Sequence, residues 1–332
     1  MTFRILLFVG VLVSSMRPAL AWDSVGHMIV AQIAWDQLTP EAKAGVEEAL
    51  GRFNEKKASD RTAEDAPYDF VTAACWMDDI RSMQDRYDFG PWHYVNFPFN
   101  LEGLPEPEAA EGPNVIWGIQ RCMDLMTGRA EDQGIDRDQA MVMLLHLVGD
   151  IHQPLHTTNR GGDLGGNLVT VRNMKLSREE EMFGKKRGGS LHGFWDSSYR
   201  RGFREGGAMV LYEMPIYDGR KPAAGHLAAM EIVRREASAL QEKHPGLGAS
   251  LLDDPAAWAH ESHAIGYEKG YGKLIRISPT GTLVKVDEHY VNTAREAAEQ
   301  RLVLAGNRMA ALINRHFAPP GAAAADNGAM KE

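Results

Sequence analysis

The stretch Arg137–His156, RDQAMVMLLHLVGDIHQPLH, decides the fold and carries the first signs of a function. Its apolar residues follow helical spacing, and Pro154 cannot donate the hydrogen bond that a continuing helix needs, so the pattern predicts an apolar helix over 137–151. His146 and Asp150 lie four residues apart and would leave the same face of that helix. A carboxylate in such a helix is costly unless it is paired or bound to metal. The pair therefore predicts either ligands of one divalent ion or a hydrogen-bonded helix pair.

Further histidine and acidic residues favour metal over an isolated pair. His156 lies beyond the proline and would approach from the turn, where it would serve a neighbouring ion. His192 and Asp196 repeat the four-residue spacing at the start of another expected helix. Segments 76–81 and 92–94 each place a potential ligand next to a large aromatic side chain. Several nitrogen and oxygen ligands without a ligand cysteine suit zinc.

The remaining patterning predicts one mostly α-helical domain over residues 22–317 with a short β-hairpin-like segment. Residues 88–113 contain five prolines and are expected to form a long ordered loop. The glycine-rich turn 161–166 precedes the strand-like stretch 167–172. The low-complexity tail 318–332 is expected to be disordered. Helices are expected over 24–38, 40–50, 66–83, 114–127, 137–151, 193–200, 223–242, 254–272 and 288–317.

Composition excludes several classes of protein. The chain has 332 residues, of which 44% are hydrophobic and 24% charged, which excludes a disordered tail protein, a collagen and a coiled-coil rod. The formal net charge is −9, so no global positive field attracts nucleic acid or anionic lipid. Binding of a phosphate polymer would therefore depend on local charges, of which bound metal ions are the strongest.

The N-terminus has the features of a secretory signal peptide over residues 1–21. Arg4 precedes a short apolar run, and Ala19-Leu20-Ala21 provides a cleavage site. The alternative is an uncleaved membrane anchor, but the run is shorter than the roughly 20 residues that span a bilayer. No later stretch is long and apolar enough for a span. We therefore expect a periplasmic or secreted protein that begins at Trp22 with a free α-amino group.

The two cysteines allow one disulfide at most. Cys75 and Cys122 are too few for a disulfide scaffold, and in an exported protein they could pair. We expect this disulfide, with two buried free thiols as the alternative.

At this point the chain resembles the S1/P1-type zinc-dependent nucleases of the phospholipase C/P1 nuclease superfamily. The resemblance runs from Trp22 to about Phe317, and its segments occur in the family's order. These segments are Trp22 with Gly26-His27, the Trp-x-Asp-x-Ile-Arg-like 76–81, Trp-His-Tyr 92–94, the histidine-rich 146–156, the glycine-rich 161–167, Leu-His-x-x-Trp-Asp 191–196 and Trp-Ala-x-Glu-Ser 258–262.

The resemblance implies an almost entirely α-helical fold that holds three zinc ions in one cleft. The implied ligands are Asp78, His93, His146 and Asp150 for one ion, His156, His192 and Asp196 for a second, and the backbone amine and carbonyl of Trp22 with His27 and the shared Asp150 for the third. Cleavage after residue 21 would then be needed to create a ligand, because a peptide nitrogen cannot replace an amine.

The expected roles follow from zinc chemistry, in which bound water becomes a nucleophile towards a phosphodiester. Asp78 would orient or deprotonate that water. Arg81 would hold a phosphate oxygen, or else form a surface salt bridge. His152 would orient neighbouring ligands, or else make a local hydrogen bond. Expected base-pocket residues are Tyr94, Asn96 and Asn167.

The resemblance implies an exported zinc endonuclease that cleaves single-stranded DNA and RNA to 5′-phosphorylated products and also acts as a 3′-nucleotidase. One alternative is a zinc phospholipase C. That family has a longer spacing than the five residues from Trp22 to His27, and a glutamate where this chain has Asp196. The other alternative is a non-catalytic exported zinc-binding protein. A monomer is the default expectation.

Overall fold

The computed structural model describes residues 22–58, 66–83, 87–99, 112–171, 189–203, 209–212, 226–248, 254–272 and 283–318. The expected signal peptide, and the expected tail beyond residue 318, lie outside the described residues. No helix in the described part of the chain is long and apolar enough to cross a membrane.

The expected mostly α-helical fold is confirmed. The longer helices are α1 (Ser24–Asp36), α2 (Pro40–Lys56), α5 (Val115–Thr127), α6 (Arg137–Ile151), α9 (His226–Lys243), α10 (Pro255–Ile265) and α11 (Glu288–Phe317). Shorter helices are α3 (Phe70–Ala73), α4 (Trp76–Asp79) and α8 (Leu191–Asp196). Single turns of other helix types cover Ile80–Met83, Gly90–His93, Pro154–His156, Ser198–Arg200 and Gly266–Tyr271.

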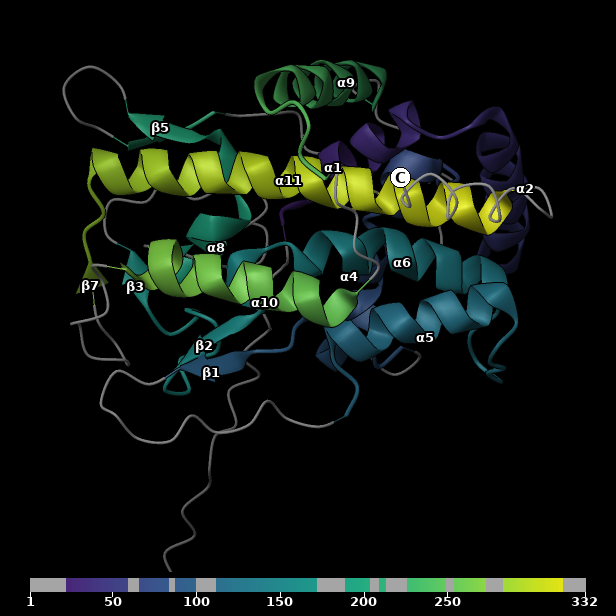
Figure 1. Cartoon of the computed structure of the whole chain (residues 1–332), viewed down its shortest axis with the longest axis horizontal. Coiled ribbons are helices and arrows are strands. Elements are labelled where there is room, and N and C mark those ends of the chain that lie inside the picture. Colours follow the sequence, from purple (N-terminus) through teal and green to yellow (C-terminus); the bar gives the residue numbers. More distant parts are fainter. Residues whose placement is uncertain are drawn as a thin grey trace, which may run out of the picture.

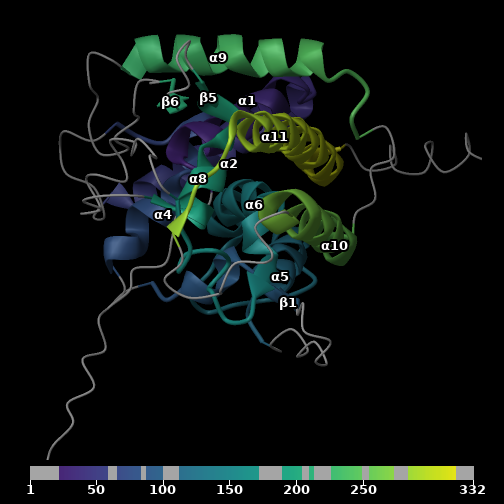
Figure 2. The same ribbon diagram turned by 90° about the vertical axis from the view of Figure 1, so that its left-hand side faces the viewer.

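Helix α6 lies at the centre of this arrangement, as its apolar sequence predicts. It packs against α5 on one side and α11 on another, with α1, α2 and α4 also in contact (Figures 1 and 2). Asp136 caps its first turn by accepting a hydrogen bond from the Gln139 amide at 2.9 Å. The helix ends at Ile151, three residues before Pro154. Fourteen consecutive residues, from 138 to 151, are buried.

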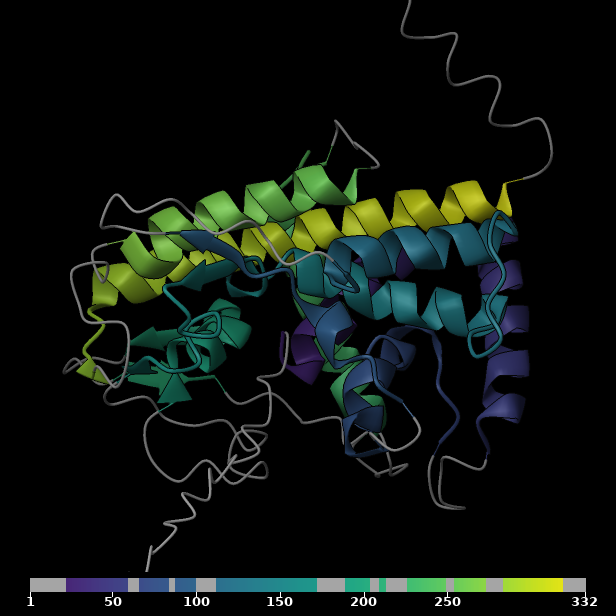
Figure 3. The same ribbon diagram turned by 90° about the horizontal axis from the view of Figure 1, so that it is seen from below.

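The strands are short and form three small sheets at the end of the molecule opposite α2 (Figures 1 and 3). Strand β1 (Phe97–Phe99) pairs in parallel with β2 (Thr158–Arg160), β3 (Thr170–Val171) pairs antiparallel with β4 (Gly189–Ser190) and in parallel with β7 (Leu283–Val284), and β5 (Arg201–Phe203) pairs antiparallel with β6 (Met209–Leu211). The antiparallel β3–β4 pair corresponds to the expected hairpin-like segment. The strand-like stretch 167–172 contributes only β3.

The expected continuous helix over 66–83 is wrong. The chain turns at Ala74 and Cys75, between α3 and α4. The Ala74 carbonyl accepts a hydrogen bond from His146 Nδ1 at 2.7 Å. A side chain from another helix thus satisfies this carbonyl at the point where the helix breaks. Other expected boundaries also shift: α2 continues to Lys56, and the expected loop 88–113 includes β1.

The expected disulfide is also wrong. Cys75 and Cys122 are both free and buried. The Cys75 thiol lies 3.5 Å from the Ser24 carbonyl oxygen, on α1. Cys122 packs inside the main apolar cluster, where burial raises the pKa of its thiol. Both cysteines belong to the main apolar cluster and form no disulfide.

Candidate metal centre

Three groups of side chains with metal-binding atoms lie beside the end of α6. Within each group the potential ligand atoms lie within 4.8 Å of one another. The groups are His27, His146 and Asp150; Asp78, His93 and His146; and His156, His192 and Asp196. The structure therefore brings together all eight side chains expected to bind metal, from segments far apart in the sequence.

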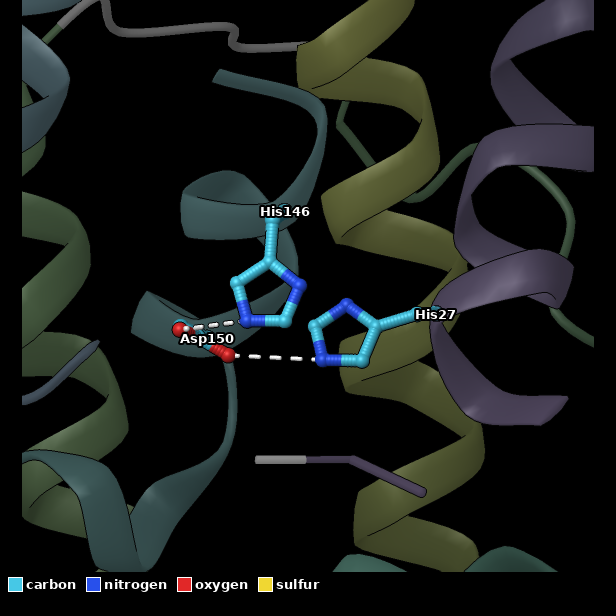
Figure 4. A group of neighbouring side chains, drawn as sticks. All are labelled: His27, His146 and Asp150. Atoms are coloured by element: carbon cyan, nitrogen blue, oxygen red, sulfur yellow. Dashed lines mark ion pairs between the residues drawn. The ribbon is translucent and has the colours of Figure 1, made fainter. Parts of the chain in front are cut away.

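The Asp150 carboxylate lies between three imidazole rings. Its Oδ2 atom is 2.9 Å from His93 Nδ1 and 3.2 Å from His146 Nε2. Its Oδ1 atom is 3.4 Å from Nε2 of His27, which comes from α1 (Figure 4). The His27 and His146 rings stack with centroids 4.0 Å apart. Asp78 approaches the same histidine, with Oδ1 at 3.8 Å from His146 Nε2.

Backbone carbonyls fix three of the histidine rings. A carbonyl oxygen only accepts, so each ring carries a hydrogen on Nδ1 and turns Nε2 towards its group. Metal-binding imidazoles are commonly oriented in this way. The pairs are His146 with Ala74 at 2.7 Å, His156 with His93 at 2.5 Å, and His192 with Gly165 at 2.8 Å.

The polar atoms of the first group fit a bound cation. Both ring nitrogens of His27 and Oδ1 of Asp150 are buried, and none of them forms a hydrogen bond with the described residues. Buried polar atoms without such partners are costly, and a metal ion would satisfy them. The donors are imidazole nitrogens and carboxylate oxygens, which zinc accepts in tetrahedral sites.

The charges of the centre also favour a cation. Burial alone would raise the pKa of Asp150, but His146, His27 and His93 hold it well below its usual range. Burial, with the neighbouring Arg81, lowers the pKa of His93 to about 4. Burial likewise lowers the pKa of His27, so this ring is neutral. The centre thus combines an ionised carboxylate with neutral imidazoles at His27 and His93.

The raised pKa of His146 shows that the carboxylates of the centre favour a positive charge at this position. Burial lowers its pKa, but Asp150 and Asp78 outweigh that effect and raise the pKa to about 9. The proton that these carboxylates hold on the ring marks the place where a metal ion would supply positive charge instead.

Asp78 and Arg81 form an ion pair at the edge of the second group. Arg81 Nε lies 3.1 Å from Asp78 Oδ1, one turn further along the chain. Burial raises the pKa of Asp78, but Arg81 and three histidines lower it more, so this carboxylate is ionised. The Arg81 side chain keeps 18% of its surface exposed. The Arg81 side chain therefore reaches solvent, and its ion pair with Asp78 lies at the edge of the metal centre.

Residue Trp22 is completely buried beside α6. Its indole Nε1 donates to the Gly149 carbonyl at 3.0 Å. The next residue, Asp23, accepts hydrogen bonds from Tyr199 at 2.6 Å and from Arg200. Its backbone amide donates to the Asp196 carbonyl at 3.0 Å. These bonds hold the start of the described chain next to two of the groups.

Comparison with known proteins shows the family of this chain. The model of the S1/P1 nucleases matches residues 22–318. The chain belongs to the S1/P1 nuclease family. Endonuclease 2 of Arabidopsis thaliana is 24% identical over 310 residues, which cover 89% of this chain and 90% of that protein.

The fungal relatives match a shorter part. Nuclease S1 of Aspergillus oryzae is 24% identical over 155 residues, which cover 45% of this chain and 48% of the relative. Nuclease P1 of Penicillium citrinum is 25% identical over 157 residues, 45% of this chain and 52% of the relative. The protein is thus a nuclease, a hydrolase of phosphodiester bonds. S1/P1 nucleases are zinc enzymes, and the three groups give this member residues able to bind metal.

The expected base-pocket residues of this nuclease lie close to the centre. Tyr94 follows His93 directly and is half-buried. Asn96 has a positive φ of 50°, and its backbone amide donates to the His156 carbonyl at 3.2 Å. Asn167 uses its side-chain amide within its own turn, donating to Leu164 O at 2.8 Å. The structure therefore leaves the Asn167 side-chain oxygen, rather than this amide hydrogen, for other contacts.

His152 makes the local hydrogen bond that is the alternative to its expected role of orienting neighbouring ligands. Its Nδ1 donates to Val148 O at 2.7 Å, and its Nε2 accepts from Arg308 at 2.9 Å. Its ring lies beside Trp258, on the side of α10 and α11. Both ring nitrogens are therefore occupied, one by Val148 of α6 and the other by Arg308 of α11.

Two site residues were missed by sequence reasoning. Gln153 donates to Asp196 Oδ1 at 2.6 Å and so orients a potential ligand. Its position inside the histidine-rich segment 146–156 is the feature of the sequence that could have indicated this role. Asp163 accepts from Tyr271 at 2.8 Å and from the amide of Gly166, which fixes the turn that contacts His192. A buried aspartate in a glycine-rich turn was the corresponding signal.

Proposed function

We propose that this S1/P1 nuclease is an exported, zinc-dependent endonuclease that cleaves single-stranded DNA and RNA and leaves 5′-phosphates. A 3′-nucleotidase activity would use the same centre. The observation that carries the proposal is the buried Asp150 carboxylate among three imidazoles, with unsatisfied polar atoms beside it. Export is supported by the signal-peptide features of residues 1–21.

The proposed ligand sets accommodate three zinc ions. They are Asp78, His93, His146 and Asp150; His156, His192 and Asp196; and Trp22, through its amine and carbonyl, with His27 and Asp150. Bound zinc would acidify a water molecule and stabilise charge on phosphate oxygens.

The side chains at the edge of the centre have complementary tasks. Asp78 is ionised and can accept a hydrogen bond from the attacking water, which orients it or takes its proton. Arg81 can keep one nitrogen on Asp78 and turn another towards a phosphate oxygen, because guanidinium has several donors. Tyr94 supplies an aromatic face on which a base can stack.

The burial of the centre favours single strands as substrates. His27, His146 and Asp150 are completely buried, and His93 almost so, which means that the reacting phosphate must approach a recessed site. A single strand can bend and unstack to reach it, whereas a duplex holds its bases in pairs. Stacking on aromatic residues also tolerates many sequences.

Matched substrates test the proposal. The purified protein would be incubated with one oligonucleotide in single-stranded and duplex form, its RNA equivalent, a 3′-nucleotide and phosphatidylcholine. We expect cleavage of the single strands to 5′-phosphorylated ends, loss of activity with a chelator, and recovery with zinc. Faster hydrolysis of phosphatidylcholine would indicate a phospholipase C instead. Zinc binding without hydrolysis of any substrate would indicate a binding protein.

A further inference from the structure

Helix α6 ends inside the protein, which creates a specific problem for its backbone. The last four carbonyl groups of a helix have no partner within it. Here Asp150, Ile151 and His152 are completely buried, so water cannot serve these carbonyls, and Pro154 has no amide hydrogen to offer. Buried carbonyls without a donor are costly. The backbone amides of His152 and Gln153 donate to the Gly149 and Asp150 carbonyls, at 3.1 and 2.9 Å, and side chains supply further donors.

Side chains from four places meet this need. Each of four carbonyls around the helix end accepts a hydrogen bond from a side chain. The pairs are Val148 with His152 Nδ1 at 2.7 Å, Gly149 with Trp22 Nε1 at 3.0 Å, Ile151 with Ser262 Oγ at 2.5 Å, and His152 with Arg301 Nε at 3.3 Å.

The donors on the α10 and α11 side are joined to one another. Arg301 donates to Ser262 Oγ at 2.6 Å and to Glu261 at 3.1 Å. Arg308 donates to both oxygens of Glu261, at 2.7 and 2.8 Å, and to His152 Nε2 at 2.9 Å. The network therefore fixes Ser262 and Arg301, which both donate to carbonyls at the helix end, relative to each other. Figures 1 and 2 show α10 and α11 side by side next to α6.

We propose that Ser262, Arg301 and Glu261 are positioning residues that hold Asp150 in place for metal. The inference rests on the proposed metal centre. Asp150 belongs to the turn whose carbonyls these residues hold, and its carboxylate must face imidazoles from two other segments at once. Metal sites tolerate errors of only about 0.2 Å in ligand distance, so a displaced turn weakens binding.

This assignment gives a task to the segment 258–262, Trp-Ala-His-Glu-Ser, which contributes no metal ligand. Trp22 donates to the Gly149 carbonyl, and Ser262 and Arg301 donate to the carbonyls of Ile151 and His152. All of these acceptors are backbone carbonyls, so the Asp150 side chain itself stays available to metal.

The variant Ser262→Ala tests the proposal with a minimal change. It removes the donor to Ile151 O without altering charge. Competition with a chelator should show zinc affinity reduced by about tenfold or more, as for other residues that support metal ligands. Cleavage should fall at limiting zinc and recover when zinc is in excess. Arg301→Lys keeps the charge but loses the planar set of donors that reaches several acceptors at once, so its zinc affinity should fall in the same direction.

The control lies at the other end of the same helix. Asp138 pairs there with Arg52 at 2.7 Å and Lys56 at 3.0 Å. Asp138→Asn should lower the unfolding temperature yet leave zinc affinity at the parent value. The proposal is overturned if Ser262→Ala and Arg301→Lys bind zinc as tightly as the parent, or if Asp138→Asn weakens zinc equally. A parent protein without zinc binding or cleavage would instead contradict the proposed function.

Discussion

Asp150 is a charged group at the C-terminal end of the largely apolar helix α6. It is completely buried, and the three imidazoles around it give only part of the positive charge that it needs, because the pKa values of His27 and His93 are lowered. A metal ion would supply the missing positive charge and a partner for Oδ1, the carboxylate oxygen that forms no hydrogen bond with the described residues.

Replacing this carboxylate by an amide should disable the centre. Asp150→Asn keeps the shape but removes the charge between the ligand groups. We expect loss of at least one zinc ion and a fall in the cleavage rate of ~10³-fold, which corresponds to a barrier higher by about 4 kcal/mol. Steady-state kinetics and elemental analysis measure both effects.

The matched control is Asp132→Asn, which makes the same chemical change where Asp132 pairs with Arg121 on the surface. Its activity should stay within a small factor of the parent. If Asp150→Asn retained the activity and zinc content of the parent, Asp150 would have no place in the site.

At the scale of elements, the crossing of α1 and α11 holds His27 against α6. The two helices approach closely at Gly306. A Cβ atom added there would lie 2.6 Å from Ile33 Cβ and 2.9 Å from Val30 O. The glycine is required by this approach, since the backbone of α1 occupies the space that a side chain would need.

Two glycine substitutions separate this contact from helix propensity. Gly306→Ala should lower the free energy of unfolding by about 1–3 kcal/mol through overpacking. Gly51→Ala on α2, where a Cβ atom meets nothing within 4 Å, should raise it by about 0.5–1 kcal/mol. Urea titration measures both. Equal changes in the two variants would show that propensity, and not the crossing, decides the outcome.

At the scale of the whole molecule, zinc should contribute to folding. The ligand groups come from α1, α4, α6, α8 and the segments between them, and they meet only when the chain is folded. Metal binding energy therefore adds to folding energy. Chelation should lower the unfolding temperature, and elemental analysis should find three zinc ions per chain. One zinc or fewer in fully active protein would contradict the trinuclear proposal.

The proposed cleavage after Ala21 would link processing of the chain to the metal centre. Trp22 is buried against α6, and hydrogen bonds to Asp23 hold it there. An α-amino group with a pKa near ~8 can become a neutral ligand, but an amide nitrogen cannot. We expect a protein that begins Met-Trp22 to lose a zinc ion and most activity while its helical content is retained. The form that begins at Trp22 should be active.

Mass spectrometry must confirm each N-terminus, because removal of the methionine would restore the amine. Equal zinc content and specific activity in the two verified forms would show that the Trp22 amine is not a ligand.

The sequence by itself determined the central helix and the ligand candidates, because both are local patterns. Apolar spacing and Pro154 set the end of α6, and residues four apart on a helix share a face wherever that helix packs. The ordered motifs led from there to the S1/P1 nucleases, a family that the match over residues 22–318 shows.

Only the tertiary structure decided which groups meet. The stacking of His27 on His146, the hydrogen bond from His146 to Ala74 where the helix breaks, and the hydrogen bond from Gln153 to Asp196 all join distant segments. Neighbouring positions in the sequence do not fix such contacts, since they depend on how whole helices pack. His152 shows the difference: it lies between two metal-ligand candidates in the chain, yet the end of α6 turns its ring towards Arg308.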